Sequence, residues 1–183
     1  MKVFFLVYIY IKDILKLSLT QEDLRKLGMK IGGGTSFYDD FYKHAEPYLI
    51  EVGNNCQITE GVKVFTHGGA HVARYKDASF DIFGKVKIGD WCYIGNNALI
   101  MPGVTIGNHV LIAAGSVVTK SIPNGVVVAG NPAKFVCTTD QYIERNGKYN
   151  VRTKGLTSRN KRNRLLNLSD DRFVKKNFLI TDE

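Results

Sequence analysis

A six-residue repeat in the middle of the chain constrains the fold more than any other feature of the sequence. Every sixth residue from position 88 is β-branched and aliphatic: Ile88, Ile94, Ile100, Ile106, Ile112 and Val118. The next residue is usually Gly or Ala, and the fourth residue after each aliphatic one is small or medium-sized. An α-helical period of 3.6 would drift out of register over this length, and the period of two in a flat strand does not place a glycine at every sixth position.

This period predicts a mainly β fold, a parallel β-helix in which each flat side uses one six-residue unit. A short strand buries the aliphatic residue, and a tight turn follows where Gly or Asn relieves the backbone. Three sides form one coil of about 18 residues, and the coils stack at the strand spacing of about 4.8 Å. Asn tolerates left-handed backbone and therefore suits such corners. Candidate corner residues are Asn54, Asn55, Asn96, Asn97 and Asn108. The same phase appears upstream at Val52, Ile58 and Val64.

The interruptions of the repeat divide the chain into three parts. We expect an N-terminal helical and apolar segment at 1–30, a β-helix at 31–137 and a basic, partly irregular C-terminal extension at 138–183. Within the β-helix, residues 66–85 leave the pattern and should form an extruded loop. Thr20 to Lys30 is typical of a short helix with Thr20 as its N-cap and Gly28 as its terminator.

The apolar run from Val3 to Ile11 is too short to cross a bilayer, which needs roughly 20 residues. We expect it to be a strand or helix packed on the body, with a weak association with a membrane surface as the lesser alternative. Three cysteines, Cys56, Cys92 and Cys137, form no CxxC pair, so neither a disulfide framework nor a structural zinc site is expected. A reducing, cytoplasmic location fits this content best.

The net charge of +8 is concentrated near the C-terminus, where residues 138–183 hold eleven Lys or Arg against six Asp or Glu. A basic surface indicates an anionic partner, such as a nucleotide-bearing cofactor, an acidic glycan, a membrane surface or a nucleic acid. Charge alone does not choose among them. No nucleic acid is expected, because the tail lacks interleaved aromatic residues and any known nucleic-acid module.

Among the four histidines, His67 is the best candidate for chemistry. It closes the last regular unit before the loop, so the rigid coil holds it while the loop can cover a ligand. His71 is the second candidate for a general base. His109 lies at a regular corner, where exposure is the default, and His44 gives no clear signal.

Several motifs resemble the hexapeptide-repeat acyltransferase superfamily: residues 101–104 (MPGV), 114–120 (AGSVVTK) and 129–134 (AGNPAK). Residues 46–74 look like its sugar and polysaccharide O-acetyltransferase branch, in which a Thr-His pair supplies the catalytic histidine. That pair falls on Thr66 and His67 here, but Gly68 replaces the acidic residue that follows in the family. The resemblance implies a left-handed β-helix, a homotrimer, acetyl-CoA as donor, a glycan or small-molecule acceptor, and no metal.

The resemblance also implies which residues bind the donor. Carried over by position, Asn96, Ala114, Thr119 and Lys120 would line the groove for the pantetheine arm, and Lys134 would meet the phosphates of coenzyme A. Small residues at Ala113 and Ala114 would let the arm lie against the backbone, and Tyr93 could pack against it. The family transfers the acyl group directly, so a neutral imidazole that takes the proton of a sugar hydroxyl is sufficient.

Three alternatives remain open at this point. N-acylation of an amino sugar on a nucleotide carrier, or acetylation of an antibiotic, would use the same machinery with another acceptor. A zinc enzyme on the same β-helix would need His67, His71 and His109 to converge on one metal ion. A non-catalytic β-helix used for assembly is favoured only by the missing acidic residue after His67.

Overall fold

The computed structural model describes residues 2–14, 18–38 and 40–178. The chain forms two compact units, Met1–Thr139 and Asp140–Glu183. The first contains all of the strands, and the second contains most of the C-terminal helical structure.

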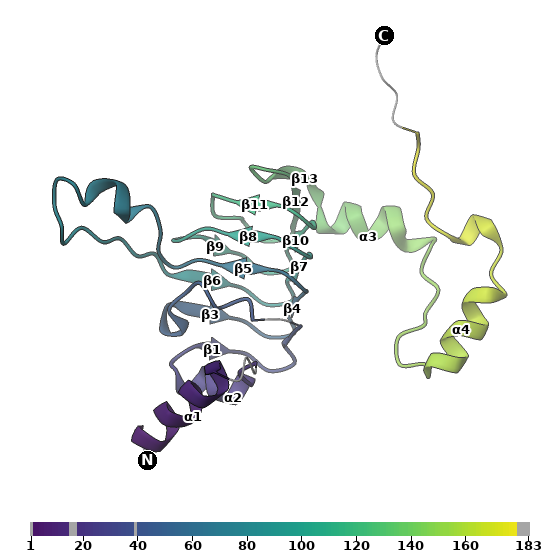
Figure 1. Ribbon diagram of the computed structural model, residues 1–183. Coiled ribbons are helices and arrows are strands. Elements are labelled where there is room, and N and C mark those ends of the chain that lie inside the picture. Colours follow the sequence, from purple (N-terminus) through teal and green to yellow (C-terminus); the bar gives the residue numbers. More distant parts are fainter. Residues whose placement is uncertain (1, 15–17, 39, 179–183) are drawn as a thin grey trace, which may run out of the picture. The chain divides into compact units, whose positions relative to one another are not determined.

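Short strands of the first unit form three sheets whose strands are almost all parallel (Figure 1). Sheet A holds β1 (Lys30–Ile31), β3 (Ile50–Val52), β6 (Val86–Ile88) and β9 (Thr105–Ile106). Sheet B holds β2 (Ser36–Phe37), β4 (Gln57–Ile58), β7 (Tyr93–Ile94), β10 (Leu111–Ile112), β12 (Val126–Ala129) and β13 (Lys134–Thr138), and β13 pairs antiparallel with β12. Sheet C holds β5 (Lys63–Val64), β8 (Leu99–Ile100) and β11 (Val117–Val118).

From β3 to β11 the chain visits sheets A, B and C in turn three times, as the six-residue period predicts for a β-helix. Each sheet contributes one column of buried aliphatic side chains to the core. The columns are Val52, Ile88 and Ile106 in sheet A, Ile58, Ile94 and Ile112 in sheet B, and Val64, Ile100 and Val118 in sheet C. The predicted parallel β-helix is therefore confirmed in its strand order and core.

The corner between sheets A and B shows why the repeat carries glycine. A Cβ atom on Gly53 would lie 2.7 Å from the carbonyl carbon of Gly89, and one on Gly89 would lie 2.7 Å from that of Gly107. No side chain fits between backbones stacked this closely. Beside these glycines, Asn54 N–H donates to Asp90 Oδ1 at 2.6 Å, and Asp90 N–H donates to Asn108 Oδ1 at 2.8 Å. Positive φ angles of 55–56° occur at the corner residues Asn55, Trp91 and His109, and Asn97 at the corner between sheets B and C has a φ of 59°.

The stacked coils of the three sheets form a prism. The predicted loop leaves this prism between β5 and β6 and contains one short 3-10 helix, Ala70–Ala73. Figure 1 shows it projecting sideways from the stacked strands. Val52 of β3 pairs directly with Ile88 of β6, although 36 residues separate them. These two strands therefore belong to neighbouring coils, and about half of the intervening chain is the insertion rather than a second coil.

The N-terminal segment is helical, and it contacts the body over only part of its surface. Helix α1 (Lys2–Ile14) exposes several large apolar side chains, including Phe4 at 83% and Tyr10 at 66% of their area. Only one side of it faces the prism, where Leu6, Ile9 and Tyr10 line a cavity with Leu19 and Tyr42. A run of apolar residues fixes neither the neighbour of a helix nor the share of its surface that is covered.

The second helix, α2 (Gln21–Lys26), agrees with the sequence signals. Thr20 caps it through a capping box with Asp23, and Gly28 follows it with a φ of 97°. The 3-10 helix η1 (Pro47–Leu49) then leads into β3.

The C-terminal part contains α3 (Thr139–Gly147), α4 (Ser158–Leu166) and the 3-10 helix η3 (Asp170–Arg172). Thr157 caps α4 by accepting from Asn160 N–H at 3.3 Å. Among the residues described, none of the helices has both the length and the apolar character required to cross a bilayer.

Candidate active site

His67 lies at the corner between sheets C and A, three residues after the end of β5. The preceding Thr66 is fully buried, and its carbonyl accepts from Gly84 N–H at 2.7 Å. His67 itself forms an antiparallel bridge with Phe83, so the two ends of the loop are joined beside it. The Phe83 ring packs edge-on against the imidazole at a centroid distance of 5.7 Å. The histidine is thus fixed by the prism on one side and by the base of the loop on the other.

Glu46 supplies the carboxylate that the sequence does not place after His67. Its two carboxylate oxygens lie 3.0 and 3.1 Å from Nδ1 of His67. With Nδ1–H donating to this carboxylate, Nε2 is left as the nitrogen that can accept a proton. The imidazole remains accessible to a ligand, because 46% of the His67 side-chain surface is exposed to solvent.

Thr66 holds Glu46 in place from the protein interior. Its hydroxyl donates to Glu46 Oε2 and accepts from Glu46 N–H at 2.8 Å. Burial disfavours the charged form of Glu46, but the hydrogen bonds from Thr66 and His67 outweigh it and lower the pKa of the carboxyl below its usual value. Glu46 is therefore ionised at neutral pH and can accept a hydrogen bond from Nδ1–H of His67.

A cavity of about 370 Å³ opens beside these residues. Its wall includes Glu46, His67 and Phe83, together with His71, Arg74 and Asp81 from the loop. Arg74 closes the loop on itself, since its Nε donates to the carbonyl of Phe80 at 3.1 Å and its Nη2 lies 3.7 Å from Asp81. The cavity can therefore hold a polar small molecule next to the free nitrogen of His67.

Sequence reasoning missed Glu46 and the loop residues Arg74, Asp81 and Phe83. One signal could have found Glu46. It stands 21 residues before His67, close to the length of one coil, which puts both residues at the same corner of neighbouring coils. For the three loop residues no repeat or motif was available.

The predicted donor residues occupy different parts of the last coils. Asn96, Ala113 and Ala114 meet at the corner between sheets B and C, where Gly95 lies directly over the backbone of Ala113 and Ala114. Lys134 opens β13 near this corner, because Ala133 N–H donates to the carbonyl of Val117. Tyr93 lies in β7 of sheet B and keeps 40% of its area exposed.

Thr119 and Lys120 share the corner of His67. They follow β11 directly, as Phe65 and Thr66 follow β5, and β8 lies between these two strands. Two strand spacings amount to about 10 Å, so the distance along this corner suits an extended thioester arm.

The other histidines do not join this site as metal ligands. His109 lies at the corner between sheets A and B with Trp91, on a different edge of the prism from His67. Over residues 2–14, 18–38 and 40–178, no three His, Cys, Asp or Glu side chains are grouped so that they could hold a metal ion. Of the two loop histidines, His71 lines the cavity but has no carboxylate partner comparable to that of His67 in the described part of the chain.

Comparisons with known proteins identify the family of the chain. The model of the family "Bacterial transferase hexapeptide (six repeats)" matches residues 85–120. Protein CapG of Staphylococcus aureus is 42% identical over 160 residues, which cover 84% of this chain and 91% of that protein. The chain belongs to the hexapeptide-repeat transferases.

Other members of this family bear the names of acetyltransferases. Galactoside O-acetyltransferase of Escherichia coli (strain K12) is 36% identical over 111 residues, covering 60% of this chain and 54% of that protein. A maltose O-acetyltransferase from Clostridium difficile 630 superposes with a TM-score of 0.51 and 29% identity, covering 64% of this chain and 73% of that one. A galactoside acetyltransferase solved with coenzyme A gives a TM-score of 0.50 at 29% identity, covering 64% and 58%. The predicted family and the predicted class of enzyme, an acetyltransferase, are confirmed.

Proposed function

We propose that this enzyme transfers the acetyl group of acetyl-CoA to a hydroxyl group of a sugar, with His67 as the general base. The observation that carries the proposal is the Glu46–His67 pair beside a cavity of about 370 Å³. The sugar acceptor is supported by relatives named as galactoside and maltose O-acetyltransferases, and the donor by the related structure that holds coenzyme A.

The reaction follows from the polarity of the pair. Glu46 holds Nδ1–H, so Nε2 takes the proton of the acceptor hydroxyl as its oxygen attacks the thioester carbonyl. The new C–O bond forms, the C–S bond breaks, and the imidazolium returns its proton to the departing thiolate. Glu46 stabilises the imidazolium between these two steps. No acyl-enzyme is required.

The donor site of the proposal uses residues of the last coils. Asn96, Ala113, Ala114, Thr119 and Lys120 would contact the pantetheine arm, Tyr93 would pack against it, and Lys134 would pair with the phosphates. The position of Thr119 and Lys120 on the corner of His67 supports this assignment, because the thioester must come close to the base.

Three further features belong to the same proposal. The resemblance to the family favours a left-handed prism and a homotrimer. The three free cysteines, all buried, favour a reducing compartment and hence the cytoplasm. The alternative of a non-catalytic scaffold depended on the missing acidic residue, and Glu46 supplies that carboxylate.

A weak association with membrane surfaces would use the exposed aromatic side chains of α1. Phe4, Tyr8 and Tyr10 are all exposed, and lysines stand at positions 2, 12 and 16 of the sequence. We expect the protein to sediment partly with vesicles that contain anionic lipid. The double variant Phe4→Ser/Tyr10→Ser should remain in the supernatant, whereas equal sedimentation of both proteins would contradict the role of α1.

The two histidines of the cavity offer a matched test of the base. His67→Ala should lower the rate of thiol release from acetyl-CoA by on the order of 10²–10⁴ with a responsive sugar. His71→Ala should keep most of the activity, since its ring lacks the Glu46 contact. Coenzyme A binding, followed by calorimetry, should be similar in both variants. A larger loss in His71→Ala than in His67→Ala would move the base to His71.

A further inference from the structure

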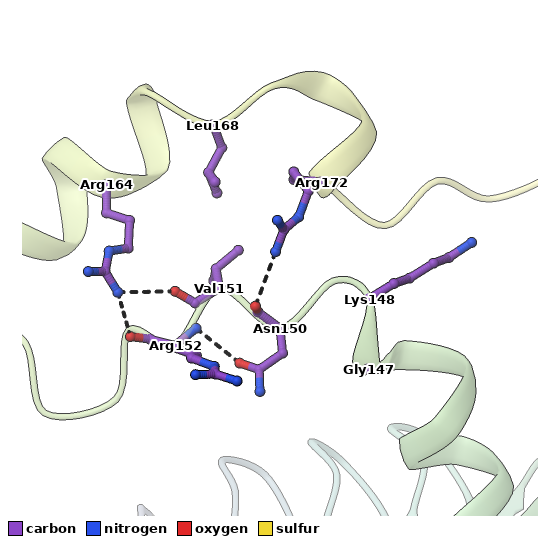
Figure 2. Close-up of a pocket in the computed structure, with 8 residues that line it drawn as sticks. All are labelled: Gly147, Lys148, Asn150, Val151, Arg152, Arg164, Leu168 and Arg172. Carbon is purple, nitrogen blue, oxygen red and sulfur yellow. Dashed lines mark hydrogen bonds between the residues drawn. The ribbon is translucent and has the colours of Figure 1, made fainter.

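The C-terminal unit holds a second cavity, of about 670 Å³, that is lined by four cationic side chains (Figure 2). These are Lys148, Arg152, Arg164 and Arg172, and no Asp or Glu is among the residues of its wall. Val151 and Leu168 add an apolar surface. All of these residues lie between positions 147 and 172, so the cavity is formed within one unit.

Two of the arginines shape the cavity through backbone contacts. Arg164 Nη1 donates to the carbonyl of Arg152 at 2.8 Å and to that of Val151 at 3.4 Å. Arg172 Nη2 donates to the carbonyl of Asn150 at 3.3 Å. Figure 2 shows both guanidinium groups reaching the same short segment from α4 and η3. A guanidinium has five N–H donors, and these bonds engage only one nitrogen of each group.

The segment between them has a constrained backbone. Arg152 has a φ of 49°, in the left-handed region that a residue with a long side chain rarely adopts. Its N–H donates to Asn150 Oδ1 at 3.0 Å, which fixes this turn. The turn therefore fixes the backbone from which the Arg152 side chain contributes to the cavity wall.

The surrounding chain offsets little of the positive charge of the cavity. From Arg145 to Ser169 the sequence has eight Lys or Arg and no Asp or Glu. Within the described ranges, none of the four lining cations forms an ion pair with a carboxylate. Asp171 lies beside Arg172 in sequence and their charges attract one another, but the Asp171 carboxyl group is hydrogen-bonded to Ser169 and makes no ion pair with the guanidinium. Clustered like charges repel one another, and a bound anion removes that repulsion.

We propose that this cavity binds a phosphate or pyrophosphate group. Arginine pairs with such oxyanions through two parallel N–H···O bonds, and three arginines can surround one anion from different sides. An open cavity of about 670 Å³ has room for one or two phosphates with part of the attached group, whereas a nucleic acid needs a continuous basic track with stacking aromatic rings. Phosphate-bearing sugar donors, lipid carriers and coenzyme A share this chemistry.

The binding can be measured on the full chain by titration calorimetry with inorganic pyrophosphate. The variant Lys148→Gln/Arg152→Asn removes two lining charges, and Asn suits the left-handed turn at position 152. The variant Arg159→Gln/Lys161→Gln removes the same charge from α4 outside the cavity. Loss of two charge-assisted contacts should weaken pyrophosphate binding about tenfold or more in the first variant. The control should bind within about twofold of the unchanged protein, since it loses only distant charge.

Parallel titrations with coenzyme A and with a nucleotide sugar distinguish which of these compounds supplies the phosphate group. Whichever of the two loses affinity in the cavity variant, and not in the control, identifies the natural source. Arg172→Gln serves as a second cavity variant, and circular dichroism checks that each variant is folded.

Three results would overturn the proposal. They are no saturable binding of pyrophosphate, an equal loss of affinity in the cavity variant and the control, or tighter binding of an RNA oligomer or of an acidic oligosaccharide that depends on the same residues. Because each readout is binding alone, failure here is distinct from failure of the acetyl-transfer reaction.

Discussion

At the scale of single residues, the imidazole of His67 depends on a chain of contacts that starts in the protein interior. Buried Thr66 fixes the carboxylate of Glu46 from two sides, and Glu46 then fixes Nδ1 of His67. Each contact decides the orientation of the next. Glu46 is a positioning residue in this arrangement, since it acts on the reaction through His67.

Replacing Glu46 by Gln tests that role. The amide keeps the shape but loses the charge that stabilises the imidazolium, so kcat should fall by on the order of 10–10³, less than in His67→Ala. The KM for acetyl-CoA should change little, and steady-state kinetics with varied donor and acceptor separates the two constants. Glu60→Gln, at an exposed corner, is the matched control and should keep full activity. An effect on the acceptor KM alone would show that Glu46 binds the acceptor instead.

The two partners of this pair differed in how well the sequence revealed them. His67 was predictable because it stands where a regular pattern stops and because a Thr-His motif marks it. Glu46 was harder to find, because only its spacing from His67 marks it and their contact crosses from one coil to the next. Such contacts depend on the length of a coil, which is irregular in this chain upstream of Val52.

At the scale of elements, the corner between sheets A and B limits the sequence more than the strands do. The strands β3 to β11 are two or three residues long, and each needs only a buried aliphatic residue at its last position. The corner instead stacks Gly53, Gly89 and Gly107 with no room for a side chain. Along this corner, the backbone N–H groups of Asn54, Asp90 and Asn108 each donate to a side-chain oxygen of an Asn or Asp in the next coil.

Two glycine substitutions distinguish crowding from loss of backbone freedom. In Gly89→Ala the new methyl group would meet rigid backbone of Gly107 at 2.7 Å, so the free energy of unfolding should fall by about 1–3 kcal/mol. In Gly33→Ala the nearest atom is Asn54 Oδ1 at 3.9 Å, and stability should be nearly unchanged or slightly higher. Urea unfolding at one protein concentration gives both values. Equal effects of the two changes would mean that the stacking distance does not limit this corner.

The elements also show where periodicity stops being informative. The repeat predicted the strand order and the core columns, because each buried position recurs at a fixed spacing. It did not show that the 36 residues from Val52 to Ile88 form one coil and an insertion, since that number is also a whole multiple of six. It said nothing of α1, whose exposed face depends on neighbours that a local pattern does not contain.

At the scale of the whole molecule, several large aromatic side chains lie exposed outside the core. Trp91 keeps 61% and Phe135 63% of their areas exposed on the prism unit, in addition to the aromatic side chains of α1. Isolated exposed apolar residues are ordinary, but large aromatic ones in such number favour burial against another chain. This surface supports the homotrimer of the proposal.

Sedimentation velocity measures the assembly directly. We expect one main species with three times the chain mass of 20.5 kDa at micromolar concentration. Because interfaces of this kind are apolar, the species should persist when salt is raised, which weakens only exposed charge contacts. A single-chain species throughout a dilution series from high micromolar concentration would contradict the trimer.

The insertion between β5 and β6 has a consequence for how such enzymes diversify. The pairing of β3 with β6 is formed by the prism itself, and backbone bonds between Thr66 and Gly84 and between His67 and Phe83 close the base of the loop. The residues that face an acceptor beyond this junction can therefore vary in length and chemistry without disturbing the folding of the coils. Mutational drift in the loop is buffered by the prism, so new acceptor preferences can arise through insertions and exchanges that leave the proton-transfer apparatus intact.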